Sequence, residues 1–142
     1  MNRNANLNKQ KPLNNKLVII GFADALSAPE VAFSLLDAGF RIAAFIRRNS
    51  NLPALRKCKS IRLFDVTAPE DDLHKTVNEL NDIYKSLQAT AIMPLNDRAV
   101  WLCDKLAVEQ EIKVAGPTGM HAQFSLDKRI QINAALNAGF NV

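Results

Sequence analysis

The sequence alternates short, continuously apolar runs with longer stretches of helical periodicity. Five apolar runs predict strands: Lys16–Phe22, Arg41–Ile46, Ile61–Phe64, Thr90–Pro94 and Ile112–Ala115. Apolar runs without polar alternation are typical of strands that are buried on both faces. Because helical segments separate these runs, the chain is predicted to be α/β. We expect a Rossmann-like parallel sheet of strand order 3-2-1-4-5 with helices on both faces.

Capping motifs and helical periodicity predict helices between the strands. The motifs S-A-P-E at Ser27–Glu30 and T-A-P-E at Thr67–Glu70 each combine a capping side chain with a proline that a first helical turn tolerates. The second helix carries an apolar stripe made of Leu73, Val77, Leu80, Tyr84 and Leu87. Asn96 or Asp97 is predicted to cap a third helix, and a last helix is predicted over Ser125–Ala138.

The composition fits one globular domain and argues against several classes of function. The chain has 142 residues, 48% of them apolar, which is enough for one buried core. The net charge of +4 is not gathered in one stripe, so no nucleic-acid partner is expected. Cys58 and Cys103 are far apart and are expected to be reduced, with Cys103 in the core. His74 and His121 have no spacing that would make a metal site.

The two ends of the chain differ from its middle. Residues 1–15 are rich in Asn and Lys and poor in apolar side chains, which predicts a disordered tail. No signal-peptide core and no apolar run long enough to span a bilayer is present, so we expect a cytoplasmic protein without a membrane partner. At the other end, Phe140–Val142 looks like the start of a new strand. The chain is therefore expected to be a fragment, unless these residues are a short tail that folds back on the sheet.

Loops at the carboxyl ends of the first and fourth strands are where a sheet of this order binds ligands. The loop Gly21–Ser27 has a single glycine, so it is not a G-x-G-x-x-G fingerprint, and Asp24 would repel phosphate. Arg47 and Arg48 follow the second strand, where NADP-binding domains often place a cation. Without the glycines, this pair is interpreted as the solvated end of a strand. The polar side chains of Leu95–Arg98 serve either as a helix cap or as contacts to a small polar substrate.

The predicted last helix begins with an unusual pattern of charge. Asp127 suits the free amides and partial positive charge of a first turn, whereas Lys128 and Arg129 oppose them. An anion nearby would explain such a misfit, and the helix amides with Lys128 would then form a phosphate site. The alternative is that both cations are solvated and merely tolerate the helix dipole.

Four short motifs, in this order, resemble the preATP-grasp domain and its junction with the ATP-grasp domain. They are Pro94-Leu95-Asn96-Asp97, Val114-Ala115-Gly116-Pro117, Leu126-Asp127-Lys128 and Ala138-Gly139-Phe140-Asn141-Val142. The superfamily includes biotin carboxylase, carbamoyl-phosphate synthetase, D-alanine–D-alanine ligase and amino-acid ligases. The resemblance covers residues 16–142. It implies a preATP-grasp domain at 16–117, followed at 118–142 by a linking helix and the start of a truncated ATP-grasp domain.

The same resemblance implies roles for particular residues. Lys128, with Arg129 beside it, matches the position that contacts the phosphates of ATP. The substrate is expected to contact residues of two loops, namely Gly21, Phe22, Ala23, Asp24, Asn96, Asp97 and Arg98. Neither a catalytic residue nor a metal ligand is expected within this chain.

By this resemblance the chain is the N-terminal, substrate-side domain of an ATP-dependent carboxylate–amine or related ligase. Such ligases use Mg-ATP to convert a carboxylate into an acyl phosphate, from which an amine displaces phosphate. The partners would be a small-molecule carboxylate and ATP, with a homodimer also possible. ATP and Mg²⁺ are expected in the longer protein, and this fragment is expected to bind neither tightly and to be inactive alone. The alternatives are an NAD(P)-binding oxidoreductase domain with Arg47 as phosphate ligand, and a non-catalytic small-molecule binding module.

Overall fold

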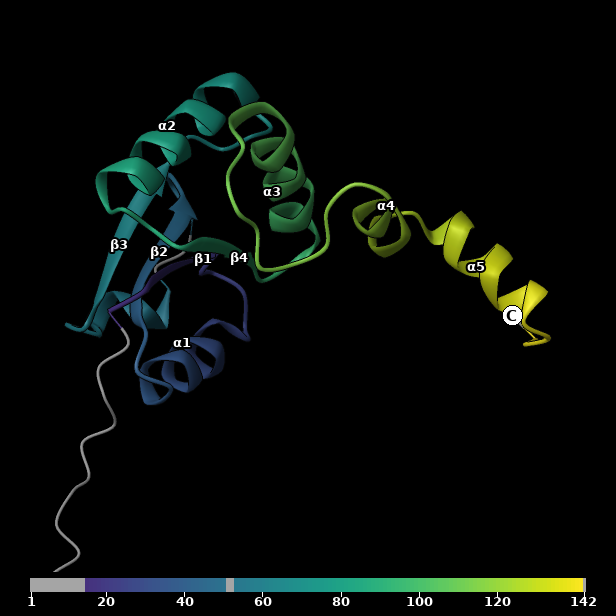
Figure 1. Cartoon of the computed structure of the whole chain (residues 1–142), viewed down its shortest axis with the longest axis horizontal. Coiled ribbons are helices and arrows are strands. Elements are labelled where there is room, and N and C mark those ends of the chain that lie inside the picture. Colours follow the sequence, from purple (N-terminus) through teal and green to yellow (C-terminus); the bar gives the residue numbers. More distant parts are fainter. Residues whose placement is uncertain (1–14, 51–52, 142) are drawn as a thin grey trace, which may run out of the picture.

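A parallel sheet forms the centre of the molecule in the computed structural model, which describes residues 15–50 and 53–141 (Figure 1). Its strands are β1 (Leu17–Gly21), β2 (Arg41–Arg47), β3 (Ile61–Val66) and β4 (Ala91–Pro94), in the order β3-β2-β1-β4. The predicted α/β class and the order of these strands are confirmed. The predicted disordered tail lies outside the described residues, apart from Asn15.

The predicted fifth strand at Ile112–Ala115 does not form. In its place Val114 makes a single parallel bridge with Ile92, and two backbone hydrogen bonds of 2.9 and 2.8 Å flank that bridge. The chain reaches this edge from Glu111, whose φ of 54° is left-handed, and leaves it through Pro117, which has no N–H to donate. Too few residues remain extended between them for a ladder. The bridge nevertheless lies beside β4, where the predicted order places the strand.

Helices cover both faces of the sheet. They are α1 (Ala28–Asp37), the 3-10 turn η1 (Ala54–Lys57), α2 (Leu73–Ser86), α3 (Asp97–Gln110), α4 (Met120–Leu126) and α5 (Lys128–Asn137). In Figure 1, α1 lies on one face, and α2 and α3 lie on the other. Ser27 stands at the N-cap of α1 as predicted, but its side chain makes no cap hydrogen bond. Asn96 caps α3, since its side-chain oxygen accepts the backbone N–H of Ala99 at 2.9 Å.

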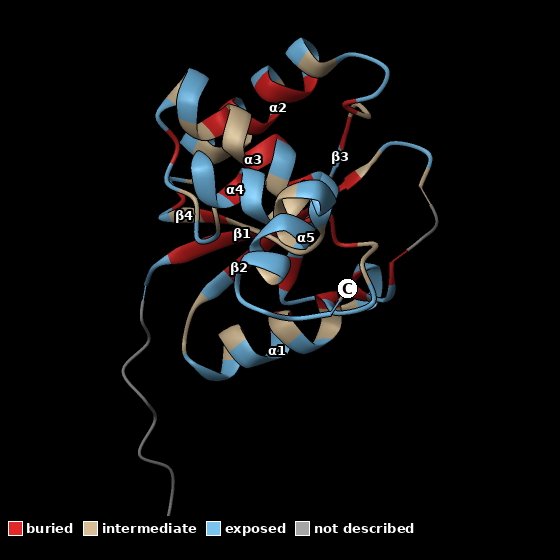
Figure 2. Ribbon diagram, turned by 90° about the vertical axis from the view of Figure 1, so that its right-hand side faces the viewer, coloured by how far each residue is buried: buried red, intermediate tan, exposed pale blue. Residues whose placement is uncertain are grey.

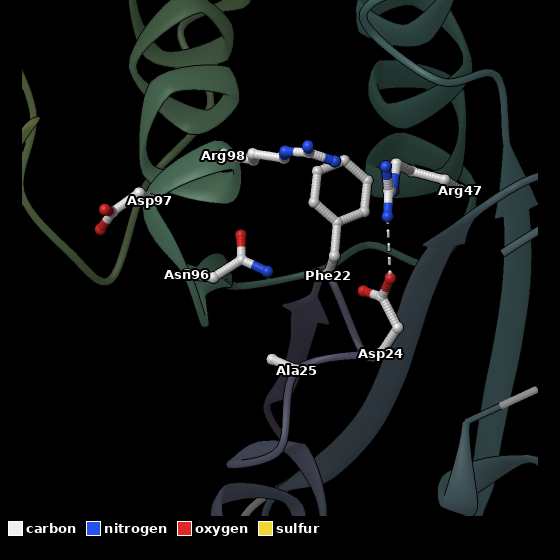
Figure 3. A pocket seen from close by; sticks show the side chains of 7 residues that line it. All are labelled: Phe22, Asp24, Ala25, Arg47, Asn96, Asp97 and Arg98. Carbon is white, nitrogen blue, oxygen red and sulfur yellow. Dashed lines mark hydrogen bonds and ion pairs between the residues drawn. The ribbon is translucent and has the colours of Figure 1, made fainter. Parts of the chain in front are cut away.

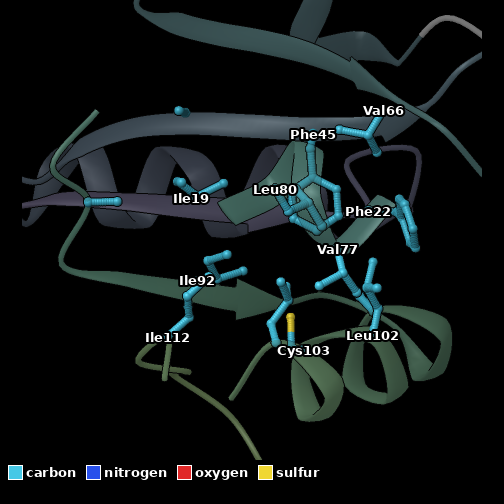
Figure 4. Packing of buried hydrophobic residues seen from close by; sticks show 14 of the residues in the cluster. Ile19, Phe22, Phe45, Val66, Val77, Leu80, Ile92, Leu102, Cys103 and Ile112 are labelled. Carbon is cyan, nitrogen blue, oxygen red and sulfur yellow. The ribbon is translucent and has the colours of Figure 1, made fainter. Parts of the chain in front are cut away.

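Successive residues of β1 enter two separate cores. Ile19 lies in one core with Leu80 of α2 and Leu102 of α3 (Figure 4). Ile20 lies in a second core with Ala32 of α1 on the opposite face, and all five residues are fully buried. This arrangement explains why the strand sequence is continuously apolar. Cys103 also lies in the first core, as predicted, and burial raises the pKa of its thiol to about 12.

The start of α2 differs from the prediction based on the T-A-P-E motif. The helix begins at Leu73, and its cap is Asp72, whose side chain accepts the backbone N–H of Lys75 at 2.9 Å. Thr67 is instead held by Glu79, whose carboxylate accepts the Thr67 backbone N–H at 2.6 Å and the Thr67 hydroxyl at 3.0 Å. Because that hydroxyl is already bound, Thr67 does not cap the helix, and the turn that follows it lies outside α2.

The last helix begins later than the predicted Ser125, and a separate helix precedes it. α4 ends at Leu126 and α5 begins at Lys128. Asp127 between them has an extended backbone, with φ −95° and ψ 106°, and its side chain accepts the backbone N–H of Arg129 at 2.9 Å. The predicted start is therefore wrong, because Asp127 ends one helix and caps the next.

α4 and α5 together, residues 120–137, form an arm that extends beyond the sheet (Figure 1) and carries mostly exposed residues (Figure 2). Ala122 of α4 is buried, and α4 contacts α3. Across its whole described length, α5 buries no residue, and its apolar side chains Ile132 and Leu136 are 48% and 53% exposed. In the described parts of the chain, we find no helix with the length and apolar character that a bilayer crossing requires.

Candidate functional site

An open cleft of about 490 Å³ lies at the carboxyl end of the sheet (Figure 3). Its lining residues come from the end of β2, the loops after β1 and β4, and the first turn of α3: Phe22, Asp24, Ala25, Arg47, Asn96, Asp97 and Arg98. We call it the sheet-edge cleft. Parallel sheets of this order bind ligands at this edge, where the strand connections reverse direction.

The ring of Phe22 forms the floor of the sheet-edge cleft and packs on a second aromatic ring. Phe22 is 1% exposed and meets the fully buried Phe45 of β2 edge to face, with ring centroids 5.0 Å apart. A Cβ at Gly21 would overlap the Phe45 ring, so only glycine allows β1 to approach β2 this closely here. The glycine at the end of β1 is thus explained by packing of the floor rather than by approach to a phosphate.

Arg47, the last residue of β2, is tied to two carboxylates. Its Nη1 donates to Glu70 Oε1 at 2.9 Å, and its Nη2 lies 3.3 Å from Asp24 Oδ2. The guanidinium carbon also lies 5.9 Å from the centre of the Phe22 ring, which favours a cation. The hydrogen bond to Glu70 raises the pKa of Arg47, with partial burial opposing it. Arg47 is therefore a fixed cation in the cleft.

Glu70 joins a second arginine to this network. Its Oε1 lies 3.5 Å from Nη1 of Arg98, the second residue of α3. The pKa of Glu70 lies below its ordinary value, first because of its own backbone N–H and then because of Arg47, with burial opposing both. The Arg98 side chain is 62% exposed. One carboxylate oxygen thus meets two guanidinium groups, and Arg98 is held loosely.

The structure brings together some of the predicted substrate residues and not others. Phe22, Asp24, Asn96 and Arg98 line the sheet-edge cleft, whereas Gly21 and Ala23 are buried beside it and do not. Asp97 lines the rim, but Figure 3 shows its side chain directed away from the other lining residues. The Asn96 oxygen is engaged as the cap of α3, which leaves its amide group to face the cleft. The cap and substrate interpretations of Asn96 are therefore compatible.

Sequence reasoning missed two residues of this network. Arg47 was expected to be a solvated strand end, but it lies in the sheet-edge cleft with its side chain 27% exposed. Glu70 was assigned to a helix cap, but it lies in the turn before α2 and binds both arginines. The available signal was position, since Arg47 ends β2 and Glu70 comes after the carboxyl end of β3, and in a parallel sheet these ends meet at one edge.

Lys128 and Arg129 lie apart from the sheet-edge cleft, in a second hollow of about 470 Å³ between α3 and the arm. We call this the arm hollow; Asp104, Lys105 and Asp127 also line it. The Lys128 Nζ lies 3.2 Å from the side-chain oxygen of Gln131, and Arg129 pairs with Asp127 at 3.2 Å, which lowers the pKa of Asp127.

The arm hollow places carboxylates beside the cations that a phosphate would use. Its cations suit a phosphate, but the Asp127 carboxylate already occupies the backbone N–H of Arg129 that a phosphate at this helix start would use. Among residues 15–50 and 53–141, no group of His, Cys, Asp or Glu side chains is arranged to hold a metal ion. Lys128 and Arg129 are also absent from the lining of the sheet-edge cleft, so the structure does not join the two predicted sites.

Comparison by sequence finds neither a family model nor a curated protein that matches this chain. Comparison by structure finds an L-amino acid ligase from Bacillus licheniformis, with a TM-score of 0.69 and 14% identity over 93% of this chain and 31% of the ligase. Glycinamide-RNase-transformylase T from Mycobacterium tuberculosis matches with a TM-score of 0.57 and 20% identity over 87% of this chain and 32% of that one. MurG from Acinetobacter baumannii also has a TM-score of 0.57, with 18% identity over 76% of this chain and 38% of its own.

These likenesses concern the fold. The ligase and the transformylase share the α/β fold of this chain, which agrees with the fold that the predicted resemblance implies. The chain spans about a third of the length of the ligase and of the transformylase. At such low identity, the residues of the site must be interpreted from their own chemistry.

Proposed function

We propose that this chain is the N-terminal, substrate-side domain of an ATP-dependent carboxylate–amine or related ligase that acts through an acyl phosphate. The observation that carries the proposal is the pair Arg47 and Arg98, whose guanidinium groups meet at the sheet-edge cleft of a fold also found in an L-amino acid ligase. The sheet-edge cleft receives the carboxylate substrate. ATP and Mg²⁺ are bound by polypeptide outside this chain.

The charges of the sheet-edge cleft suit a small carboxylate. A guanidinium group binds a carboxylate through two parallel hydrogen bonds, which gives both affinity and orientation. Arg98 is available for such a pair because its side chain is 62% exposed and its contact to Glu70 is 3.5 Å long. Asp24 lines the same space and repels a polyphosphate, which carries several negative charges, more than a ligand with a single carboxylate. The cleft is therefore assigned to the carboxylate and not to the nucleotide.

The chain has a binding role in this scheme, and no catalytic residue is proposed in it. Its side chains hold and orient the carboxylate, while phosphoryl transfer and the attack of the amine take place with groups of other polypeptide. One observation supports this division: the chain matches only about a third of the length of the ligase.

The geometry weakens the alternative of an NAD(P)-binding domain. That alternative needs Arg47 as a free ligand for the 2′-phosphate, but Arg47 is already paired with Asp24 and Glu70. Both carboxylates would repel a phosphate at this position. A titration with NADPH checks the point, since saturable micromolar binding that is lost in Arg47→Ala would favour the oxidoreductase domain.

Calorimetric titration of the 142-residue chain tests the proposed function. We expect weak, millimolar binding of L-amino acids, loss of this binding in Arg98→Ala, and no tight binding of Mg-ATP. Arg56→Ala is the matched control, because Arg56 forms an exposed ion pair with Asp65 at 3.1 Å without lining the sheet-edge cleft. Tight, Mg²⁺-dependent binding of ATP by this chain would contradict the proposed division of labour. Amino-acid binding that survives in Arg98→Ala would contradict the proposed site.

A further inference from the structure

Glu70 lines one hollow of the surface and contacts two arginines of another. The first is a hollow of about 380 Å³ lined by Pro69, Glu70, Arg98 and Trp101, which we call the Trp101 hollow, and the second is the sheet-edge cleft. Arg98 lines both of them. Glu70 itself lines the Trp101 hollow, and its carboxylate contacts Arg47 and Arg98, which line the sheet-edge cleft.

The contacts of Glu70 are those that a carboxylate ligand would make. Its Oε1 takes a hydrogen bond of 2.9 Å from Arg47 and lies 3.5 Å from Arg98. It is presented by a short turn, in which the backbone N–H groups of Asp71 and Asp72 donate to the carbonyl of Ala68 at 3.0 and 3.2 Å. A carboxylate on a turn outside the helices can move away without breaking α2 or the sheet.

We propose that Glu70 occupies the position of the substrate carboxylate and must be displaced by it, and that the apolar part of the substrate then enters the Trp101 hollow. The inference rests on the proposed function, because it takes the ligand of this site to be a carboxylate. It adds a substrate class, namely carboxylates that carry an apolar side chain, and a competing group within the protein. Glu70 is a specificity-determining residue in this scheme rather than a catalytic one.

Displacement of Glu70 leaves no buried charge without a partner. The Glu70 side chain is 49% exposed, so water replaces the lost contacts of the released carboxylate. Exposed ion pairs such as the one with Arg98 are weak, because water and salt compete with them. A ligand carboxylate that binds Arg98 through both of its oxygens would make a stronger pair than the single oxygen of Glu70 does.

The position of Trp101 directs the rest of the ligand. Trp101 follows Arg98 by three residues on α3, so their side chains emerge on the same side of the helix. Its side chain is partly exposed, and Pro69 supplies a second apolar wall. A carboxylate bound to Arg98 thus places its substituent against the indole ring, where an aromatic or aliphatic group removes apolar surface from water.

Fluorescence of Trp101 tests the inference directly, because Trp101 is the single tryptophan of the sequence. The probes are phenylacetate and acetate, which share a carboxylate and differ in the apolar group. We expect phenylacetate to change the emission and to bind about tenfold more tightly than acetate. Glu70→Gln keeps the shape of the side chain without its charge, so it should tighten phenylacetate binding about fivefold or more, whereas Arg98→Ala should abolish it.

Asp65→Asn is the matched control for Glu70→Gln. Asp65 is also an exposed carboxylate paired with an arginine, and the exposures of the two side chains are 48% and 49%. This variant should bind phenylacetate as the wild type does, and circular dichroism checks that each variant is folded.

Each failure has a separate meaning. If the wild type binds phenylacetate through Arg98 but Glu70→Gln does not bind it more tightly, the inference is overturned and the proposed function stands. Equal binding of acetate and phenylacetate would also overturn the inference alone, because the apolar group would then contribute nothing. If neither the wild type nor Glu70→Gln binds any carboxylate, the proposed function falls as well.

Discussion

The sheet-edge cleft and the arm hollow both place arginine beside aspartate, but different parts of the chain position these pairs. In the sheet-edge cleft, Arg47 is 27% exposed and contacts Asp24, which is 23 residues away along the chain. In the arm hollow, Arg129 is 88% exposed and contacts Asp127, only two residues before it. Buried strands fix the first pair, whereas local chain geometry makes the second. A ligand-binding geometry is therefore better supported at the sheet edge than on the arm.

The largest predicted effect is a difference in stability, and its test uses one leucine from the sheet core and one from the arm. Leu80 of α2 is fully buried in the sheet core, so Leu80→Ala should lower the free energy of unfolding by about 3 kcal/mol. Leu136 of α5 is 53% exposed, so Leu136→Ala should change it by less than about 0.5 kcal/mol. Urea unfolding of both variants gives the values. Equal losses would mean that the arm is packed as tightly as the sheet with α1, α2 and α3, which we call the body.

Loss of a helix cap should have a smaller effect that also differs between the regions. Asp72 caps α2, whose buried face belongs to the core, so Asp72→Ala should cost about 1 kcal/mol of global stability. Asp127 caps α5, which buries no residue along its described length. Asp127→Ala should therefore loosen α5 while the body unfolds as before. Amide hydrogen exchange follows each helix separately, and an equal loss of protection in the sheet for both variants would contradict the comparison.

The smallest predicted effect is the pH dependence contributed by Glu70. Its pKa is lower in the folded chain than its ordinary value of 4.5, so the unfolded chain binds this proton at a higher pH than the folded chain does. The stabilisation is thus complete above pH 4.5 and is lost as the pH falls through the lowered folded value. Because the side chain is about half exposed, we expect less than about 1 kcal/mol.

Glu70→Gln removes this contribution, so its stability difference from the wild type should shrink as the pH falls. Chemical unfolding at neutral and acidic pH measures that difference. A difference that grows toward acid would reverse the sign of the argument. Asp65→Asn serves here too as a control for the loss of one exposed carboxylate.

The body was predictable from the sequence because burial on both faces leaves a local trace. Ile19 and Ile20 lie in different cores, and only a continuous apolar run satisfies both. The apolar stripe of α2 also leaves a local trace, because Val77 and Leu80 on one face of this helix are fully buried. The fifth strand was not predictable in this way, because the apolar residues near Val114 form one bridge instead of a ladder.

The errors arose where distant residues compete for one side chain. Thr67 has the local pattern of a cap, but Glu79, twelve residues later, takes its hydroxyl and leaves the cap to Asp72. Arg47 and Glu70 are 23 residues apart, so no motif shows that they meet. The loops after β1 and β4 were identified because the strand order alone places them at the sheet edge.

Mapping of amide chemical shifts during titration with phenylacetate tests the central claim most directly. If the sheet-edge cleft is the carboxylate site, the largest shifts should occur at Arg47, Glu70 and Arg98, with Lys128 and Arg129 nearly unchanged. The largest shifts at Lys128 and Arg129, with Arg47 and Arg98 unaffected, would place the ligand in the arm hollow and contradict the account.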